Sequence, residues 1–206
     1  MLVLTALRRL VPQVNAMRDG GWSGAEVWDG EEIAGKTVGI IGFGSIGRDL
    51  GRRFVLFGAD VLAHTRTVPS HVPAGTAFVS LQVLLERSDI VIVAVSLNDS
   101  TRGLLGPAEL FRMKRSALLV NIARGAVVDE PALIEALRSD RLRAALDAYV
   151  REPLPTDSPL RTLPNVLQTP HSAGSSRQSR ERIWLQMLDN LDRLAEGRDL
   201  VNLVNS

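Results

Sequence analysis

The sequence predicts an α/β fold built on a doubly wound parallel sheet. Three observations carry this prediction. Short apolar runs alternate with helix-like segments, most of these runs lack a strict apolar–polar alternation, and a glycine-rich turn joins the first run to a helix. Strands buried on both faces of a parallel sheet have this continuous apolar character. Strands that alternate with helices connect through right-handed crossovers, which place the strands parallel.

Six apolar runs are the expected strands. They are short and rich in β-branched residues or leucine, as buried strands are. The runs span residues 37–41, 60–63, 90–95, 117–122, 144–147 and 166–168.

Apolar stripes at helical spacing predict the helices between these strands. The stripes consist of Ile46, Leu50, Phe54 and Phe57, then Leu81, Leu84 and Leu85, then Leu133, Ile134 and Leu137. A closing helix is expected from Ser175 to about Glu196, with Ile183, Met187, Leu191 and Leu194 along one side. It should end at Gly197, because glycine commonly terminates helices.

The opening segment, residues 1–14, predicts one helix with an uncovered apolar stripe of Leu4, Leu7 and Leu10. We do not expect a signal peptide here, because the arginines follow the apolar stretch instead of preceding it. A short irregular piece from Trp22 to Trp28 leads into the first strand. We expect a cofactor-binding domain over residues 1–174 and a separate closing helix and tail over 175–206.

Composition narrows the class of partner. The 206 residues include 24 basic and 23 acidic side chains, which leaves a formal net charge of +1. Such a chain has no broad positive electrostatic potential to attract nucleic acid or an acidic membrane, so a small molecule or another protein is the expected partner.

No cysteine is present, which excludes disulfides and thiolate metal sites. No run reaches the roughly 18 apolar residues of a membrane span. We expect a cytoplasmic protein without a metal site.

Residues 42–47 form a G-x-G-x-x-G motif between a strand pattern and a helix pattern. Gly42 permits the tight turn, Gly44 lets the backbone approach a pyrophosphate, and Gly47 lets helix and strand pack closely. The helix N-terminus adds unpaired N–H groups that bind anions. The motif in this context predicts a Rossmann-type dinucleotide site.

The end of the second strand favours NADP(H) over NAD(H). NAD-binding versions of the motif carry an acidic residue there that bonds the ribose hydroxyls. The nearest acidic residue, Asp60, instead begins the strand, and Thr65 and Arg66 follow its end. A guanidinium at that point can pair with a 2′-phosphate, and Thr65 can donate to it. The alternative is that Arg66 is a solvated loop residue and NAD is held through other contacts.

Polar side chains follow three later strands. Arg124 follows the fourth expected strand, Asp147 ends the fifth and is followed by Glu152, and His171 follows the sixth. Ligands of open α/β sheets bind at the carboxyl ends of the strands. We therefore expect these residues to converge beside the pyrophosphate.

Four sequence blocks resemble the signatures of the D-isomer-specific 2-hydroxyacid dehydrogenases, a family that includes glyoxylate, hydroxypyruvate and D-lactate dehydrogenases. They span residues 32–47, 121–130, 147–155 and 169–174, in the family's order. The segment from Thr101 to Leu105 also resembles the family, although Ser96 stands where a proline is common.

The resemblance implies roles for individual residues. His171 would be the acid and base, Glu152 the carboxylate that keeps it protonated, and Arg124 the cation that binds the substrate carboxylate. Asp147 would bond the nicotinamide carboxamide. Further cofactor contacts are implied for Ser45, Ile46, Val95, Ser96, Thr101, Ile122, Ala123, Arg124, His171 and Gly174.

The resemblance also implies a second domain of about 100 residues that precedes the opening helix in the family and is absent from this sequence. One hypothesis is an NADP-dependent dehydrogenase, acting as a homodimer on a small 2-keto or 2-hydroxy acid such as glyoxylate or hydroxypyruvate. The alternative is an NAD(P)-binding module that docks another protein through its uncovered stripe. A third interpretation is that Met1 is an internal methionine of a longer chain.

Overall fold

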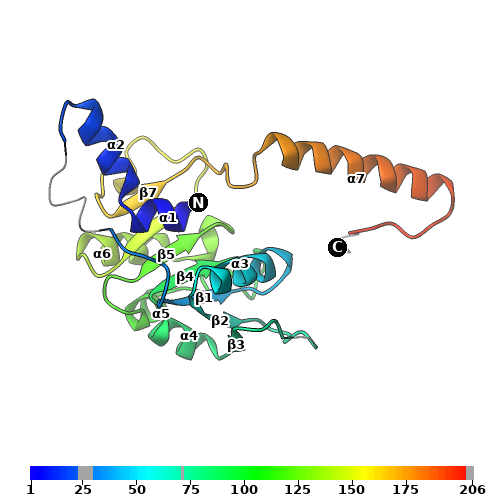
Figure 1. Ribbon diagram of the computed structural model, residues 1–206, viewed down its shortest axis with the longest axis horizontal. Coiled ribbons are helices and arrows are strands. Elements are labelled where there is room, and N and C mark those ends of the chain that lie inside the picture. Colours follow the sequence, from blue (N-terminus) through cyan, green and yellow to red (C-terminus); the bar gives the residue numbers. More distant parts are fainter. Residues whose placement is uncertain (23–29, 71, 203–206) are drawn as a thin grey trace. The chain divides into compact units, whose positions relative to one another are not determined.

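The computed structural model describes residues 1–22, 30–70 and 72–202 (Figure 1). Trp28 of the predicted irregular piece lies outside these ranges. The chain divides into two compact units, Met1–Pro170 and His171–Ser206.

The first unit contains one seven-stranded parallel sheet in the order β3-β2-β1-β4-β5-β6-β7, which confirms the predicted fold class. The order reverses after β1, as it does in doubly wound sheets. The strands are β1 (Thr37–Ile41), β2 (Asp60–His64), β3 (Thr76–Phe78), β4 (Ile90–Val93), β5 (Leu118–Asn121), β6 (Arg143–Leu146) and β7 (Val166–Gln168).

Six of these strands coincide with predicted runs, and β3 is an addition to them. It has only three residues and no buried one, so no apolar run marks it. It lies at the edge of the sheet beside β2. The prediction of six strands was therefore wrong by one edge strand, whose formation depends on its neighbour.

Helices cover both faces of the sheet. The segments are α3 (Ser45–Leu56), α4 (Leu81–Arg87), α5 (Pro107–Arg112) and α6 (Glu130–Arg138), with short 3₁₀ turns at Gly125–Val127 and Pro159–Arg161. Ser80 and Asp129 directly precede α4 and α6, and their side chains accept from the amide of the third residue of each helix. Such caps satisfy amides that have no partner within the helix.

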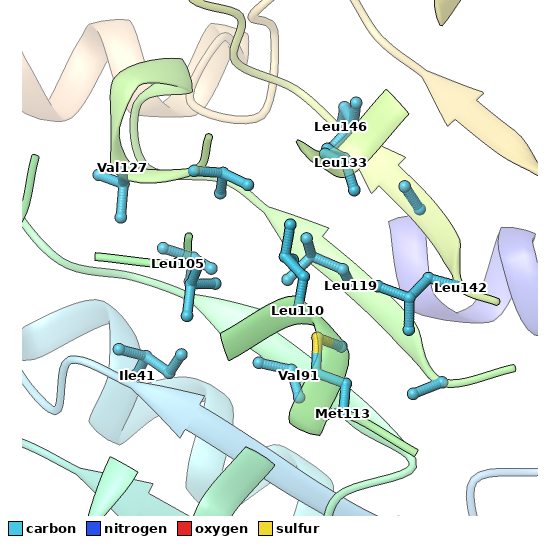
Figure 2. Close-up of a cluster of buried hydrophobic side chains, with 14 of the residues drawn as sticks. Ile41, Val91, Leu105, Leu110, Met113, Leu119, Val127, Leu133, Leu142 and Leu146 are labelled. Carbon is cyan, nitrogen blue, oxygen red and sulfur yellow. The ribbon is translucent and has the colours of Figure 1, made fainter. Parts of the chain in front are cut away.

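Two apolar clusters fill the space between helices and sheet. One packs α4, α5 and α6 against the sheet and contains Leu84, Leu110 and Leu133 (Figure 2). The other packs α3 and the opening helix against the opposite face. Every residue of β4 and β5 is buried, so these central strands fix the positions of the loops that follow them.

The opening segment differs from its prediction. It forms two helices, α1 (Leu2–Leu7) and α2 (Leu10–Arg18), which are separated where Arg9 adopts a left-handed backbone conformation with φ of 48°. Leu7 is 1% exposed and belongs to the core, so the expected uncovered stripe through this residue was wrong. Helix α2 buries none of its residues. Within residues 1–18, most of the exposed large apolar side chains lie on this helix: Leu10, Val11, Val14 and Met17.

The second unit contains α7 (Arg177–Ala195), close to the predicted closing helix. Ser176 caps it and exchanges hydrogen bonds with Ser179. The predicted stripe of Ile183, Met187, Leu191 and Leu194 is present, and all four side chains are exposed. Among the described residues, no helix has the length and apolar character needed to cross a membrane.

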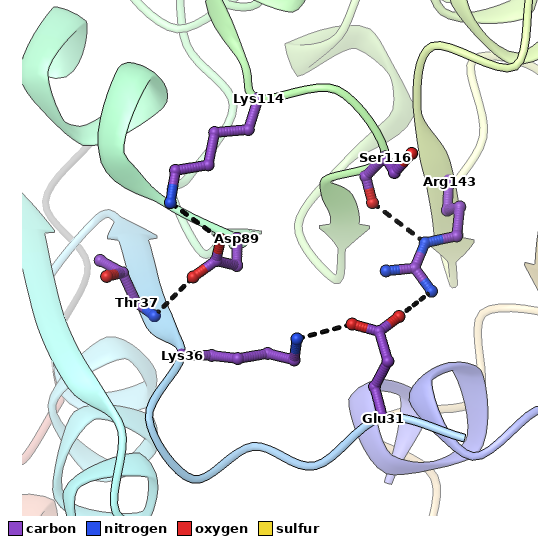
Figure 3. A network of polar contacts seen from close by, with 7 residues as sticks. All are labelled: Glu31, Lys36, Thr37, Asp89, Lys114, Ser116 and Arg143. Carbon is purple, nitrogen blue, oxygen red and sulfur yellow. Dashed lines mark hydrogen bonds and ion pairs between the residues drawn. The ribbon is translucent and has the colours of Figure 1, made fainter. Parts of the chain in front are cut away.

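An ionic network ties together the amino ends of four strands (Figure 3). Glu31 accepts from Lys36 before β1 and pairs with Arg143 at the start of β6, both at 2.6 Å. Asp89, before β4, accepts from Lys114 and from the amide of Thr37, both at 2.8 Å. Arg143 Nε also donates to the carbonyl of Ser116, before β5.

The network predicts a loss of stability in acid. Burial raises the pKa of Glu31, but hydrogen bonds and charges from Lys36 and Arg143 outweigh it and lower that pKa below its ordinary 4.5. A carboxyl with a lowered folded pKa contributes stability above its unfolded pKa, and this contribution is lost as the pH falls through the folded pKa.

We therefore expect Glu31→Gln to lower the free energy of unfolding by about 1 kcal/mol at neutral pH, the upper range for half-exposed pairs. The difference between the two proteins should vanish well below pH 4.5, where Glu31 is protonated. Urea unfolding across pH measures it, and high salt should shrink the difference because salt screens the pairs. A difference that does not vary with pH would contradict this account.

Candidate active site

The turn after β1 has the backbone geometry that a dinucleotide requires. Gly42 has φ of +94°, and a Cβ there would lie 2.6 Å from the carbonyl oxygen of Ala94. A Cβ on Gly47 would overlap the carbonyl oxygen of Gly42, so the third glycine allows α3 to pack on the turn. The Gly42 amide donates to the carbonyl of His64 at 2.8 Å, which fixes the turn to the end of β2.

The N-terminus of α3 faces open space at this turn. A Cβ on Gly44 would meet no atom within 4 Å, and no side chain caps the helix. Ser45 and Ile46 are exposed, and the isoleucine is 58% exposed. Uncapped amides at the start of a twelve-residue helix bind anions well. The turn thus has room and donors for a pyrophosphate.

The residues predicted to select the cofactor lie beyond β2. Asp60 begins β2 and is exposed at the opposite edge of the sheet. Thr65 is half-buried and Arg66 is exposed, immediately after the strand. His64, the last residue of β2, is oriented by a contact of 3.1 Å between Nδ1 and the carbonyl oxygen of Val79.

The loop after β4 is closed by Thr101. Its hydroxyl donates to the carbonyl of Ser96 at 2.7 Å and accepts from the amide of Asn98 at 2.9 Å. Val95 is half-buried and Ser96 is exposed. The three predicted cofactor contacts of this segment thus lie in one small loop at the carboxyl end of β4.

The loop after β5 presents Arg124. Its side chain is exposed, and Nη1 donates to the carbonyl of Ala123 at 2.7 Å. Ile122 is half-buried and Ala123 is buried. Asn121, the last residue of β5, is 2% exposed, and its side chain bonds the backbone of this loop.

The loop after β6 contains two predicted acidic residues. Asp147 is 2% exposed and accepts from the hydroxyl of Thr169 at 2.5 Å. Glu152 is exposed, and its Oε1 accepts from the amide of Tyr149 at 3.0 Å. The structure thus holds both carboxylates at one end of the sheet.

Tyr149 connects this loop to the end of β7. Its hydroxyl donates to the carbonyl oxygens of Leu146 and Thr169 at 3.1 and 2.9 Å. Burial raises the pKa of Tyr149, and the charge of Asp147 raises it further. The phenol therefore remains a neutral donor at neutral pH.

Within the first unit, the predicted residues all lie at the carboxyl edge of the sheet, following β1, β2, β4, β5 and β6. His171 and Gly174 belong to the second unit, where both are exposed and His171 has φ of 52°. Sequence reasoning missed Asn121, Tyr149 and Thr169 as supports of the site. The position of these polar residues at strand ends is the signal that marks them.

The sequence of this chain is similar to that of known oxidoreductases. The sequence pattern described as "D-isomer specific 2-hydroxyacid dehydrogenase, NAD binding domain" matches residues 1–173. A glyoxylate reductase from Aeropyrum pernix is 38% identical over 213 aligned positions, which cover 99% of this chain and 64% of that protein.

Two solved structures show the same fold. A crystal structure of the TT0316 protein from Thermus thermophilus is 41% identical, with a TM-score of 0.89 over 99% of this chain and 65% of the other. A D-isomer specific 2-hydroxyacid dehydrogenase from Xanthobacter autotrophicus Py2, in complex with NADPH and MES, is 34% identical, with a TM-score of 0.85 over 99% of this chain and 84% of the other. The chain thus spans slightly less than two thirds of the length of the glyoxylate reductase it matches.

Proposed function

The chain belongs to the D-isomer specific 2-hydroxyacid dehydrogenase family through its NAD-binding domain, and from this premise we propose that it binds NADP(H) and transfers a hydride to or from a small 2-keto or 2-hydroxy acid in the cytoplasm. The observation that carries the proposal is the shared edge of the sheet. The open dinucleotide turn at Gly44, the exposed guanidinium of Arg124 and the carboxylates of Asp147 and Glu152 all follow strands at that edge.

The residues of the first unit fit a nicotinamide dinucleotide. Gly42, Gly44 and Gly47 shape the turn, and the amides of Ser45 and Ile46 begin α3 beside it. These residues would hold the pyrophosphate. The remaining predicted contacts lie in loops that follow β2, β4, β5 and β6: Thr65, Arg66, Val95, Ser96, Thr101, Ile122, Ala123 and Asp147. When bound, the nicotinamide supplies the hydride that reduces the carbonyl carbon.

Arg124 and the acid–base pair act on the substrate in this proposal. The guanidinium of Arg124 forms a bidentate ion pair with the substrate carboxylate. It also places a permanent positive charge where negative charge develops on the carbonyl oxygen. His171 donates the proton to that oxygen during reduction and takes it back during oxidation. Glu152 stabilises the positive charge that the imidazole carries when it is protonated.

Consumption of NADPH with a panel of 2-keto acids tests this proposal, with glyoxylate and hydroxypyruvate as the first substrates. We expect turnover in the full chain and its loss in His171→Gln. Calorimetry should still show NADPH binding, because the glycine turn and the amides at the start of α3 that would hold the pyrophosphate are unchanged. Binding of NADPH without any turnover that depends on His171 would rule out independent catalysis.

Arg66 is expected to select the cofactor. Arg66→Ala should weaken NADPH binding by roughly 10- to 100-fold, because it removes one charge-assisted hydrogen bond to the 2′-phosphate. NADH binding should stay within about twofold, because NADH has no 2′-phosphate. Titration of both dinucleotides measures the ratio, and Arg52→Ala on the exposed side of α3 is the control. Equal losses of affinity for NADPH and NADH would mean that Arg66 does not select between the two cofactors.

We also propose that the chain assembles as a homodimer. Helix α2 has nine residues and buries none of them, while four of its apolar side chains are exposed. Isolated helices of this length are marginal in water, so contacts with a second copy would stabilise it. A cavity of about 850 Å³ between α1, α2 and the segment around β7 includes one of them, Val11, in its lining. Light scattering should give twice the chain mass, and Val14→Lys should shift it toward the monomer.

The same exposed surface supports a second candidate function, an NAD(P)-binding module that docks another protein without turnover. The chain would then bind the dinucleotide, show no activity toward 2-keto acids, and change its assembly when NADP(H) is added. Light scattering with and without cofactor separates the two candidates. A chain whose mass is unaffected by cofactor and which turns over a keto acid excludes the module.

A further inference from the structure

We propose that Asn121 is a positioning residue: its side-chain amide fixes the backbone around Arg124 and thereby aims the guanidinium at the substrate. The inference rests on the proposed function only in taking Arg124 as the group that binds the substrate carboxylate. The effect of Asn121 on the loop is tested separately from activity.

Both ends of the Asn121 amide are bonded to the loop. Its Oδ1 accepts from the amide of Ala123 at 3.0 Å, and its Nδ2 donates to the carbonyl of Arg124 at 3.0 Å. One side chain therefore binds the backbone on both sides of the Cα of Arg124. An apolar residue of the same size can replace neither bond, and aspartate can replace only the first.

Burial makes these bonds strong restraints. Asn121 is 2% exposed, so water does not readily compete for its amide. The strand that carries it is fixed on both sides, because β5 pairs with β4 and β6. The amide therefore transmits the fixed position of the sheet to an exposed loop.

A second contact holds the same loop from the side of β6. Gly125 lies so close to the next loop that a Cβ would overlap the backbone of Tyr149 and Val150. The amide of Asp147 donates to the backbone carbonyl of Asn121 at 3.0 Å. The loop that carries Arg124 is thus held on one side by the two hydrogen bonds of the Asn121 side chain, which we call the clamp. On the other side it contacts the backbone of Tyr149 and Val150. Loss of the clamp would leave the loop held on one side only.

Limited proteolysis tests the clamp without requiring turnover. Trypsin cuts after arginine, and Arg124 is exposed and directly precedes Gly125. We expect cleavage at this bond to be about tenfold faster in Asn121→Ala, because opening the loop no longer costs the two hydrogen bonds of Asn121. Asn121→Asp should be cut at an intermediate rate, because it keeps an acceptor for the amide of Ala123 but loses the donor to the carbonyl of Arg124. Mass spectrometry assigns each cut.

Asn165 provides the matched control. Its amide also bonds two backbone carbonyls, those of Leu137 and Leu142, at 2.9 and 3.0 Å, but it precedes β7 at the opposite edge of the sheet. Asn165→Ala should leave cleavage after Arg124 within about twofold of the unmodified chain. Equal rates in Asn121→Ala and Asn165→Ala would overturn the proposal.

Hydrogen exchange in the unmodified chain tests the clamp without any variant. The Ala123 amide lies outside the strands, and its bond to Asn121 should slow its exchange at least about tenfold relative to an unprotected amide. Exchange at the unprotected rate would also overturn the proposal. This measurement remains informative if a substituted chain fails to fold.

Steady-state kinetics then separate positioning from general stability. In the holoenzyme, Asn121→Ala should raise the KM for the keto acid about tenfold and the KM for NADPH by less, because the substrate carboxylate meets Arg124 directly while NADPH keeps its contacts at the glycine turn. Asn165→Ala should change neither value. An unchanged keto-acid KM with normal turnover in Asn121→Ala would overturn the positioning role. Absence of turnover in the unmodified chain would instead refute the proposed function, and proteolysis would still decide whether Asn121 holds the loop.

Discussion

Replacement of Arg124 with glutamine is expected to lower kcat/KM for a 2-keto acid by roughly 100- to 1,000-fold, the usual cost of losing one group that stabilises developing charge. The structure places this guanidinium at the carboxyl end of β5, exposed and held by its bond to Ala123. Glutamine keeps hydrogen-bonding capacity but loses the charge and the two-pronged geometry. Steady-state kinetics measure the loss.

Arg115→Gln is the matched control for Arg124. This exposed arginine precedes β5, whereas Arg124 follows it. The control should retain kcat/KM within about twofold, because surface charges far from a site contribute little to it. Both variants should still bind NADPH, because neither substitution alters the glycine turn that would hold the pyrophosphate. Retained keto-acid reduction in Arg124→Gln would remove this residue from the proposed mechanism.

Gly125→Ala is expected to destabilise the first unit by about 3 kcal/mol, the upper end of the usual cost of overpacking, because the added methyl group meets backbone atoms that cannot turn away. The added Cβ would overlap main-chain atoms of Tyr149 and Val150. Either the 3₁₀ turn at Gly125 or the loop after β6 must move, and both loops hold site residues. Urea unfolding measures the change, and keto-acid reduction should be lost with it.

Gly44→Ala is the control for the added methyl group. Gly44 has φ of −73°, and its Cβ would meet no atom within 4 Å. The free energy of unfolding should change by no more than about 0.5 kcal/mol. Gly125→Ala with the stability of the unmodified chain would mean that the two loops are not in the close contact described.

The fold was predictable where buried strands carry continuous apolar runs. Residues 37–41 and 166–168 match their strands at both ends. Strand β3 was not predictable, because pairing with β2 and not its own composition holds it in the sheet. The break between α1 and α2 at Arg9 could not be predicted either. The helical spacing of the apolar residues continues across it, whereas Arg9 adopts a left-handed backbone conformation that ends one helix and starts the next.

The sequence predicts which candidate residues follow the strands, but not which residues hold their loops in place. Gly42 and Arg124 follow strands in the sequence, which is enough to place them at one edge of a parallel sheet. The bonds of Asn121 and Tyr149 depend on which strands become neighbours, and that order is set by the whole sheet. Single-sequence reasoning has no access to such long-range pairing.

The ionic network of Glu31 and Asp89 has a practical consequence for protein engineering. It lies at the amino ends of the strands, whereas Arg124 and Asp147 follow their carboxyl ends. A five-residue strand such as β1 separates the two edges by about 13 Å, beyond the range over which substitutions usually couple. Substitutions of the charges at the amino edge should therefore add independently to substitutions in the loops that carry Arg124 and Asp147.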